Sequence, residues 1–469
     1  MSNFILQSTF VSISCFFSFC FTAYATEREY GQTTSIPDII AEAEQISEIA
    51  EKHNDYTLLS SVAERFYENV MPTLTEGEIV NIIEDSSQNN LYKSMVIDLY
   101  SLANDEATLS ATVDNSVVDA SLASLVIPNG DLSIMAMTSL ADPAVLSEHQ
   151  LKTMIHNGNN AEQVVSLKLL CNQYAEEAYN LINSVLFSEQ EETVLYDAAI
   201  NFIPRLIGKV DNLTEESAIS LIRDIMQKTH DEKIKITCIQ ALMELGTPEA
   251  INVVCEEKES LPFELVRYFY ENVDMENELL SEYIDNESML HAVRGAKNRL
   301  GNALYRDGVL GGLEWHAGLV GHANGPMYNG GAWVIHHPGP DNVVEYGTFT
   351  EFLDGNNDKG ELYKSSVSQS TAYDIFYTAH DLTNEGIAYS YSPMLRSSKS
   401  SGKIHPSDIT KIRCDGVVEY CYEYNGVRLQ GPDDSTNTWD ISTAFGADYH
   451  PGSFRPSLQA QCFDREVSH

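Results

Sequence analysis

The sequence is constrained most by a helical spacing of apolar residues that continues from about Ile36 to Glu287. The stretch "IPDIIAEAEQISEIAEKH", for example, repeats apolar residues at intervals of three and four. Glycine and proline are sparse, and short polar breaks such as "IPNGD", "HNGNN", "KVDNLTEES" and "LGTPEA" interrupt the pattern. This spacing predicts an all-α region, to which we assign residues 26–290.

Three stretches of this region resemble one another: "DLSIMAMTSLADPAVL", "EQVVSLKLLCNQYAEEA" and "EKIKITCIQALMELGTPEAI". They recur at roughly 30 to 40 residues, the scale of stacked helical hairpins. The last stretch most resembles a HEAT repeat. We therefore expect a HEAT-like array that binds a protein partner or braces a neighbouring domain. An irregular helical bundle without true repeats is the alternative.

The composition changes after about Leu300. All three tryptophans and eight of the 13 histidines lie beyond this point, and glycine becomes frequent. "GVLGGLEWHAGLVGH", "GAWVIHHPGP" and "NVVEYGTF" are typical of short strands bounded by glycine and proline. "CDGVVEYCYEYNGV" predicts a helix that ends near Gly426. Residues 291–469 are therefore expected to form an α+β domain.

The first 25 residues are typical of a secretory signal peptide. An apolar run from Phe10 to Phe21 precedes Ala23-Tyr24-Ala25, which has small residues where a signal peptidase cleaves. We predict export to a periplasm or the extracellular space, with the mature chain starting near Thr26. An interfacial N-terminal helix is the alternative.

The net charge of −41 makes nucleic acid an unsuitable partner, because both surfaces are strongly negative. Beyond the signal, no run is apolar enough to cross a bilayer, so no transmembrane segment is expected.

Export permits disulfides, but the six cysteines beyond the signal do not suggest a disulfide scaffold. Cys171, Cys238 and Cys255 lie within helical apolar patterns and are expected to be buried thiols. Cys414 and Cys421 are two helical turns apart, roughly 10 Å, which is too far for a disulfide.

Cys414 stands where the predicted helix begins, which is a place that suits a nucleophile. Partial positive charge and free N–H groups at a helix N-terminus favour a thiolate and can hold an oxyanion. Arg413 adds positive charge, whereas Asp415 opposes it. His316 lies between apolar neighbours in "EWHAGLV" and is the candidate base, and His336 or His337 would orient its ring.

These segments resemble the NlpC family of cell-wall cysteine peptidases. "RCDGVVEYCYEYNGVRL" resembles the family's nucleophile helix, "WHAGLVG" its histidine strand, and "AWVIHHPGPDNVVEYGTFTEFL" the hairpin that follows. Here the histidine strand precedes the cysteine helix. That order is similar to the circularly permuted branch, which includes relatives of lecithin–retinol acyltransferase. The resemblance covers about Tyr305 to Phe463 and implies a papain-like fold.

The resemblance implies that Cys414 is the nucleophile, His316 the base and His336 the third polar residue, with His337 as the alternate. Asp415 is a further possible site residue, and it stands where the family more commonly has Ser. The implied reaction is cleavage of amide bonds in peptidoglycan stem peptides, without a cofactor or metal. About sixty residues between the hairpin and the cysteine helix are expected to form an insertion on the substrate side.

Three other hypotheses remain open. An acyl-lipid hydrolase or acyltransferase would suit relatives in the permuted branch. A binding or scaffolding protein would combine the helical array with an inactive hydrolase fold. A metal-dependent hydrolase would use an imidazole-rich cluster, for which the candidate ligands are His316, His322, His336, His337 and Asp341.

Overall fold

The structure is a computed structural model of the 469-residue chain. It describes residues 35–53, 59–106, 146–188, 194–229, 231–257, 299–308, 315–323, 332–391, 394–399, 402–429, 439 and 455–466. The predicted signal peptide and the predicted boundary near residue 290 lie outside these ranges.

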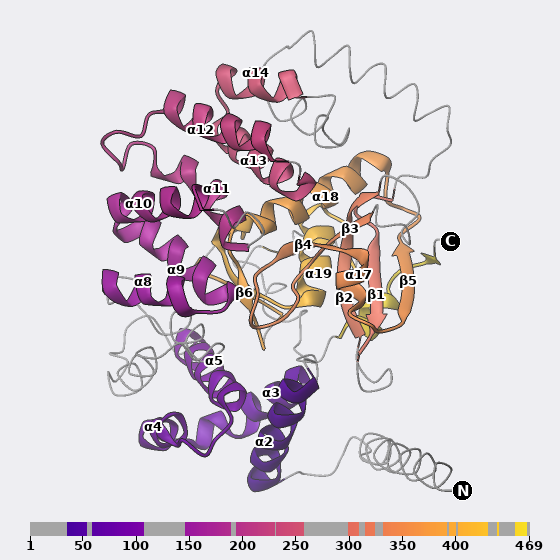
Figure 1. The fold of residues 1–469 in the computed structure, drawn as a ribbon. Helices are drawn as coiled ribbons and strands as arrows, with labels where there is room; N and C mark the ends of the chain where they lie inside the picture. Colours follow the sequence, from indigo (N-terminus) through magenta and orange to yellow (C-terminus); the bar gives the residue numbers. More distant parts are fainter. Residues whose placement is uncertain are drawn as a thin grey trace, which may run out of the picture.

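The N-terminal half of the described chain is helical (Figure 1). Its first group of helices lies at the foot of the view in Figure 1, and the second group stacks above it along one side of the strands. The first group comprises α2 (Ile36–His53), α3 (Leu59–Asn69), α4 (Glu76–Glu84) and α5 (Asn90–Glu106). The second comprises α8 (Glu148–Asn157), α9 (Asn160–Gln173), α10 (Ala175–Leu186), α11 (Val194–Leu206), α12 (Glu215–Lys228), α13 (Glu232–Leu245) and α14 (Pro248–Glu257).

The polar breaks in the sequence become helix ends because their side chains satisfy free backbone groups. Asn159 accepts from the N–H of Glu162, whose carboxylate in turn accepts from the N–H of Asn159, so "HNGNN" separates α8 from α9. Gly246 ends α13 at φ 61°, a conformation that favours glycine, and "LGTPEA" therefore separates α13 from α14. The break "IPNGD" lies outside the described residues.

The C-terminal region contains a six-stranded sheet in the order β4-β3-β2-β1-β5-β9, and every pairing in it is antiparallel. Its strands are β1 (Ala303–Asp307), β2 (Trp315–Ala323), β3 (Ala332–His336), β4 (Glu345–Thr348), β5 (Asp358–Tyr363) and β9 (Arg465–Glu466). The helices of this region are α17 (Phe349–Leu353), α18 (Gln369–Thr383), α19 (Cys414–Tyr424) and α21 (Pro456–Ala460).

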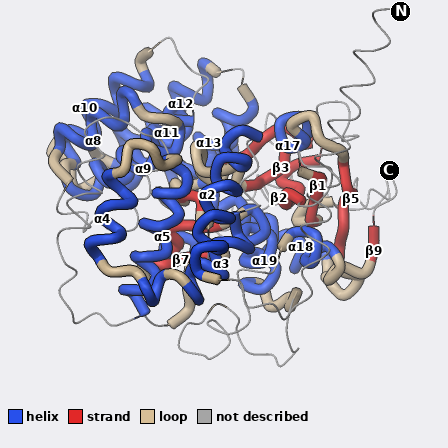
Figure 2. The backbone as a smooth tube through the Cα atoms, turned by 90° about the horizontal axis from the view of Figure 1, so that it is seen from below, coloured by secondary structure: helices blue, strands red, loops and turns tan. Residues whose placement is uncertain are grey.

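Side chains alternate between the two faces of this sheet, and the two faces pack against different helices. On one face, Leu304, Val320 and Val334 share a small apolar cluster with Phe349 and Phe352 of α17. On the other face, the main core includes Ala303, Ala317, Leu319, Ile335 and the apolar side of α19. Figure 2 shows α17 and α19 on opposite sides of the strands.

The segment between the predicted hairpin and the cysteine helix is part of the fold, which corrects the expectation of an insertion. Strand β5 pairs with β1 in the six-stranded sheet. The same segment supplies α18 and a second sheet in the order β6-β8-β7. The strands of that sheet are β6 (Ala388–Tyr389), β7 (Leu395–Ser397) and β8 (Ile409–Ile412).

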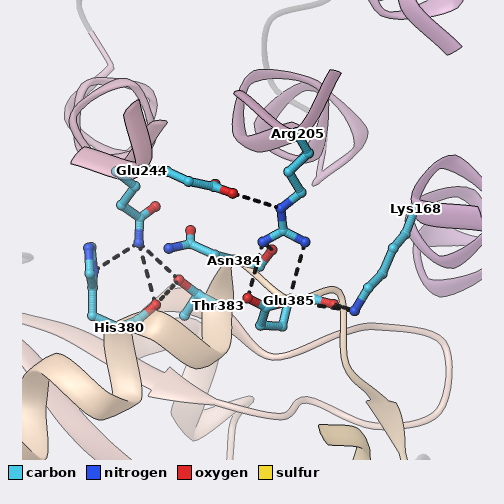
Figure 3. A network of polar contacts seen from close by, with 8 residues as sticks. Lys168, Arg205, Glu244, His380, Thr383, Asn384 and Glu385 are labelled. Carbon is cyan, nitrogen blue, oxygen red and sulfur yellow. Dashed lines mark hydrogen bonds and ion pairs between the residues drawn. The ribbon is translucent and has the colours of Figure 1, made fainter. Parts of the chain in front are cut away.

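Polar contacts join the two halves of the molecule. Asp98 of α5 pairs with Lys411 of β8 at 2.7 Å, with both side chains fully buried. Arg205 of α11 pairs with Glu385 at 3.1 Å (Figure 3). Gln240 of α13 donates to Nδ1 of His380 at 2.9 Å. One apolar core also runs from the helices into the sheet.

The structure confirms the coarse prediction of a helical N-terminal half followed by a sheet-containing C-terminal region. HEAT-like repeats and a papain-like fold stay predictions. Within the described residues, no helix has the length and apolar character needed to cross a membrane.

Candidate active site

Two neighbouring strands bring His316 and His336 together. His316 is the second residue of β2, and His336 is the last residue of β3. Nε2 of His316 lies 2.9 Å from Nδ1 of His336, and the rings meet edge to face. The hydrogen bond between these two predicted site residues requires one ring to donate and the other to accept.

The histidine pair is enclosed by an aromatic wall. The ring centroid of Phe352 in α17 lies 5.4 Å from that of His316 and 5.4 Å from that of His336. His316 is only 6% exposed and His336 only 5%. Burial lowers the pKa of His336 to about 3 and holds the pKa of His316 well below its usual value, with Arg306 as the next cause for both. Both imidazoles are therefore neutral at pH 7.

A glycine in strand β4 leaves room for the ring of His336. Gly347 lies against Nε2 of His336, and a Cβ atom at this position would stand 2.8 Å from that nitrogen. A hydrogen atom is the only side chain that fits here without a shift. The position of the His336 ring thus depends on a glycine in the neighbouring strand.

Cys414 is the first residue of α19, as the sequence predicts. Its thiol is 1% exposed, and burial raises its pKa to about 12. Asp415 also raises the pKa of this thiol, whereas the backbone N–H groups of Ala317 and Asp415 lower it. The sulfur therefore lies within hydrogen-bonding range of the N–H of Ala317, the residue that follows His316.

Arg413 lowers the pKa of the Cys414 thiol, but its guanidinium is also paired with Asp415. Its guanidinium forms two hydrogen bonds to the carboxylate of Asp415, from Nε at 2.9 Å and from Nη2 at 2.6 Å. Both side chains are buried. Asp415 also accepts from the N–H of Gly416 at 3.1 Å. Arg413 and Asp415 thus form a buried ion pair at the start of the helix.

Helix α19 and the ring of His316 lie on different faces of the sheet. Helix α19 packs on the face of Ala317, whereas the ring of His316 lies on the face of Phe352. Among the described residues, the Cys414 thiol and the His316 ring share no hydrogen bond. The structure therefore joins the two histidines directly, and it places the thiol beside the backbone of the first one.

His337, the alternate to His336, lies apart from the pair. Its Nε2 donates to the carbonyl of Ile387 at 3.1 Å, and its ring packs edge to face on Tyr389. Burial lowers its pKa to about 3. Because successive strand residues face opposite sides of the sheet, only one of the two adjacent histidines can meet His316.

The imidazole-rich cluster is not assembled as a metal site in the part of the chain that the structure describes, where no group of three or more potential ligands is found. Asp341 accepts from the amide of Asn159 in the helical half at 2.6 Å. The side chain of His322 lies outside the described residues.

Lys233 and Phe352 near the histidine pair were missed from the sequence. The ammonium of Lys233, in α13, helps to lower the pKa of His336, although it comes from the helical half. Nothing in "DEKIKITCIQ" distinguishes this lysine from a solvated one. Phe352 lies in the quoted stretch "YGTFTEFL", but its contact with both rings requires α17 to fold onto the sheet.

The histidine pair can accept a proton at His316 if the neutral rings adopt one particular tautomer. When Nε2 of His316 donates to Nδ1 of His336, the Nδ1 atom of His316 keeps a lone pair and can accept a proton.

In comparisons with known proteins, the chain matches no family model, no curated protein and no solved structure at a significant level.

Proposed function

We propose that this protein is an exported cysteine hydrolase that cleaves amide bonds, with Cys414 as nucleophile, His316 as base and His336 as the residue that orients the base. The observation that carries the proposal is the 2.9 Å hydrogen bond between the two histidines, with a helix N-terminal thiol beside the next backbone N–H. A cysteine, a histidine and an orienting polar group are the parts that thiol catalysis requires.

The reaction would begin with proton transfer from the thiol to Nδ1 of His316. The sulfur attacks the substrate carbonyl carbon, and N–H groups at the start of α19 stabilise the oxyanion. The proton on His316 then passes to the leaving amine as the carbon–nitrogen bond breaks. Water attacks the thioester, gives its proton to His316, and releases the acid and the thiol.

This chemistry requires a substrate-bound form that is more open than the form described here. The thiol is 1% exposed with a pKa of about 12, so a thiolate–imidazolium pair is unfavourable in the closed site. Substrate binding has to bring the His316 ring and the sulfur into contact and admit a carbonyl group. Such gating by closure and opening is common in enzymes that exclude water.

Peptidoglycan stem peptides are the substrate class that the sequence resemblance favours. Acyl lipids are the second class. The net charge of −41 weighs against an anionic lipid surface, because such a surface would repel this protein.

Digestion of purified cell wall by the mature chain, residues 26–469, tests the proposal, with mass analysis of the fragments. Wild-type protein should release amide-cleaved fragments, and Cys414→Ala should release none. Cys421→Ala is the matched control, because Cys421 is a buried thiol in the same helix. Equal activity of Cys414→Ala and wild type would rule the mechanism out. A parallel assay on neutral and anionic acyl lipids tests the second substrate class.

One observation favours a second candidate, a binding or scaffolding protein with an inactive hydrolase fold. The neutral, buried thiol and the two neutral imidazoles resemble packed core residues as much as a poised nucleophile. This candidate predicts that wild-type protein turns over neither substrate class. It also predicts that wild type and Cys414→Ala both bind cell-wall fragments.

A further inference from the structure

A cavity lies between the helical half and the sheet-containing half, separate from the histidine pair. Its empty space is about 450 Å³, a volume that includes space open to solvent. Helices α9, α11 and α13 form one wall, and β4 with the end of α18 forms the other. Val164, Val194, Phe202 and Val343 give it an apolar lining on both sides. This cavity therefore offers space and apolar surface to a small ligand.

Three buried oxygen atoms on the cavity wall have no hydrogen-bond donor in the described part of the protein. They are Oδ1 of Asn201, Oε2 of Glu345 and Oδ1 of Asn384. Asn201 is only 6% exposed, so bulk water does not compensate for it freely. An unpaired buried acceptor costs about 1–3 kcal/mol. Three such atoms on one cavity point to an occupant that donates hydrogen bonds.

The charged groups of the cavity favour a cation over an anion. Asp197 and Glu345 are two carboxyl groups against one ammonium, that of Lys233. Lys233 lies 3.5 Å from Asp197, and Thr237 also donates to Asp197 at 3.3 Å. Among the described residues, no donor forms a hydrogen bond to Oε2 of Glu345. Burial raises the pKa of Glu345 to about 7, and a cation next to it would lower that pKa again.

We propose that this cavity binds a small primary alkylammonium ligand, whose three N–H donors pair with Asn201, Glu345 and Asn384 while its alkyl chain packs on the apolar lining. An ammonium carries as many donors as the wall has unpaired acceptors. An anion would face these oxygens with repulsion, and an uncharged hydrocarbon would leave them unpaired. A bare metal ion fits less well, because amide and carboxylate oxygens here are accompanied by an apolar wall.

The ligand would join the two halves of the molecule. Asn201 belongs to α11 of the helical half, whereas Glu345 and Asn384 belong to β4 and to the end of α18. The cavity also borders the polar network of Figure 3, because Thr383 and Asn384 line it. Gln240 on the cavity wall donates to Thr383 at 3.2 Å. Occupancy should therefore raise the stability of the whole chain by mass action.

Calorimetric titration and thermal unfolding of the full mature chain with n-butylammonium test this proposal. Wild type should show saturable binding and a rise in melting temperature. Tetramethylammonium carries the charge without N–H donors, and 1-butanol carries the chain without the charge. Each should bind at least about tenfold more weakly than n-butylammonium, because charge-assisted hydrogen bonds are lost. This comparison uses only the wild-type protein.

Two variants assign the binding to the cavity. Glu345→Gln keeps the shape and removes the charge, and it should weaken n-butylammonium binding about 10- to 100-fold. Asn201→Leu removes an unpaired acceptor, so it should abolish binding without lowering the melting temperature of the ligand-free protein. Glu256→Gln is the control, because Glu256 lies on the surface in an exposed ion pair with Arg223.

Three results would overturn the proposal. They are no saturable binding by wild type, equal binding of n-butylammonium and tetramethylammonium, or unchanged binding by both cavity variants. The first result would mean that water alone pairs with the three oxygens. Because none of these assays uses hydrolysis, failure here and failure of the proposed hydrolase function are distinguishable.

Discussion

At the scale of single residues, the candidate site depends on a missing side chain at one neighbouring position as much as on the aromatic packing around it. The His336 ring has its place because Gly347 has no side chain, and it is uncharged because Phe352 and the sheet exclude water. A hydrogen bond between two neutral rings is modest in energy, about 0.5–1.5 kcal/mol. Packing, and not the hydrogen bond alone, therefore holds the rings of His316 and His336 against each other.

Gly347→Ala should separate the histidine pair. Its Cβ atom would lie 2.8 Å from Nε2 of His336, so the ring must move and lose its hydrogen bond to His316. We expect a loss of about 1–3 kcal/mol in the free energy of unfolding, measured by urea denaturation. If the proposed function is correct, hydrolysis should also fall sharply.

Gly77→Ala is the matched control for this change. Gly77 lies in the first turn of α4, and a Cβ atom added there would meet no other atom within 4 Å. The variant should therefore be neutral or slightly more stable than wild type. A Gly347→Ala protein with the stability of Gly77→Ala would show that the ring does not depend on this glycine.

His337→Gln should make the unfolding free energy less dependent on pH. The pKa of His337 is about 3 in the folded chain and about 6.5 in the unfolded chain. Between these values only the unfolded state takes up the proton, so this group lowers stability as pH falls from about 6.5 toward 3. Removing it should flatten the slope by about 1.4 kcal/mol per pH unit within this window.

The comparison must be made with wild type at each pH, because Glu345 opposes the effect. Burial raises the pKa of Glu345 to about 7, so this carboxyl group adds stability as pH falls from 7 toward its unfolded value. Urea denaturation curves at pH 7, 6, 5 and 4 give the slopes. Parallel slopes for the two proteins would mean that His337 is protonated in the folded chain.

At the scale of elements, α19 begins with a buried ion pair, and replacing one of its members alone should destabilise the protein. Arg413 and Asp415 are buried and satisfy each other across one intervening residue, Cys414. Their backbone geometry places the thiol at the helix N-terminus. The pair thus explains how an aspartate, which raises the pKa of the thiol, is compatible with this position.

Asp415→Ala should destabilise the protein by about 3–5 kcal/mol, because it leaves the Arg413 guanidinium buried without the Asp415 carboxylate. A second change, Arg413→Met, should recover most of that loss. Thermal and urea unfolding of both single variants and the double variant measure the coupling between the two residues. Additive losses in the double variant would show that the two side chains do not depend on each other.

The elements were predictable from the sequence where local patterns decide them. The helix of "IPDIIAEAEQISEIAEKH" is confirmed as α2, and the helix that starts at Cys414 is confirmed as α19. The burial of Cys171, Cys238 and Cys255 is also confirmed. These features depend on periodicity and on capping, which are properties of short segments.

The rest could not be read locally because it depends on contacts between distant segments. Strand β5 pairs with β1 across more than fifty positions, so no local pattern in "DKGELY" indicates its place in the sheet. Lys233 comes close to His336 only because α13 packs beside β4. The choice between His336 and His337 follows from which face of the sheet each residue occupies.

At the scale of the whole molecule, buried charge connects the first helices to the last strands. Asp98 of α5 is fully buried and pairs with Lys411 at 2.7 Å, and its backbone carbonyl accepts from Arg396 at 2.7 Å. Burial opposes ionisation of Asp98, but Arg396 and Lys411 hold its pKa below the usual value. Because the apolar core is continuous across the same boundary, we expect the two halves to unfold together.

Asp98→Ala should therefore destabilise both halves at once. The change leaves the Lys411 ammonium fully buried without the Asp98 carboxylate, for which we expect a loss of about 3–5 kcal/mol. Far-ultraviolet circular dichroism reports mainly the helical half, and the fluorescence of the three tryptophans reports the C-terminal region, so both signals should shift by the same amount in urea. Glu256→Gln, in an exposed ion pair, should shift neither by more than about 0.5 kcal/mol. If Asp98→Ala shifts the fluorescence signal alone, the halves are separate cooperative units, and the cavity between them cannot transmit ligand binding to the whole chain.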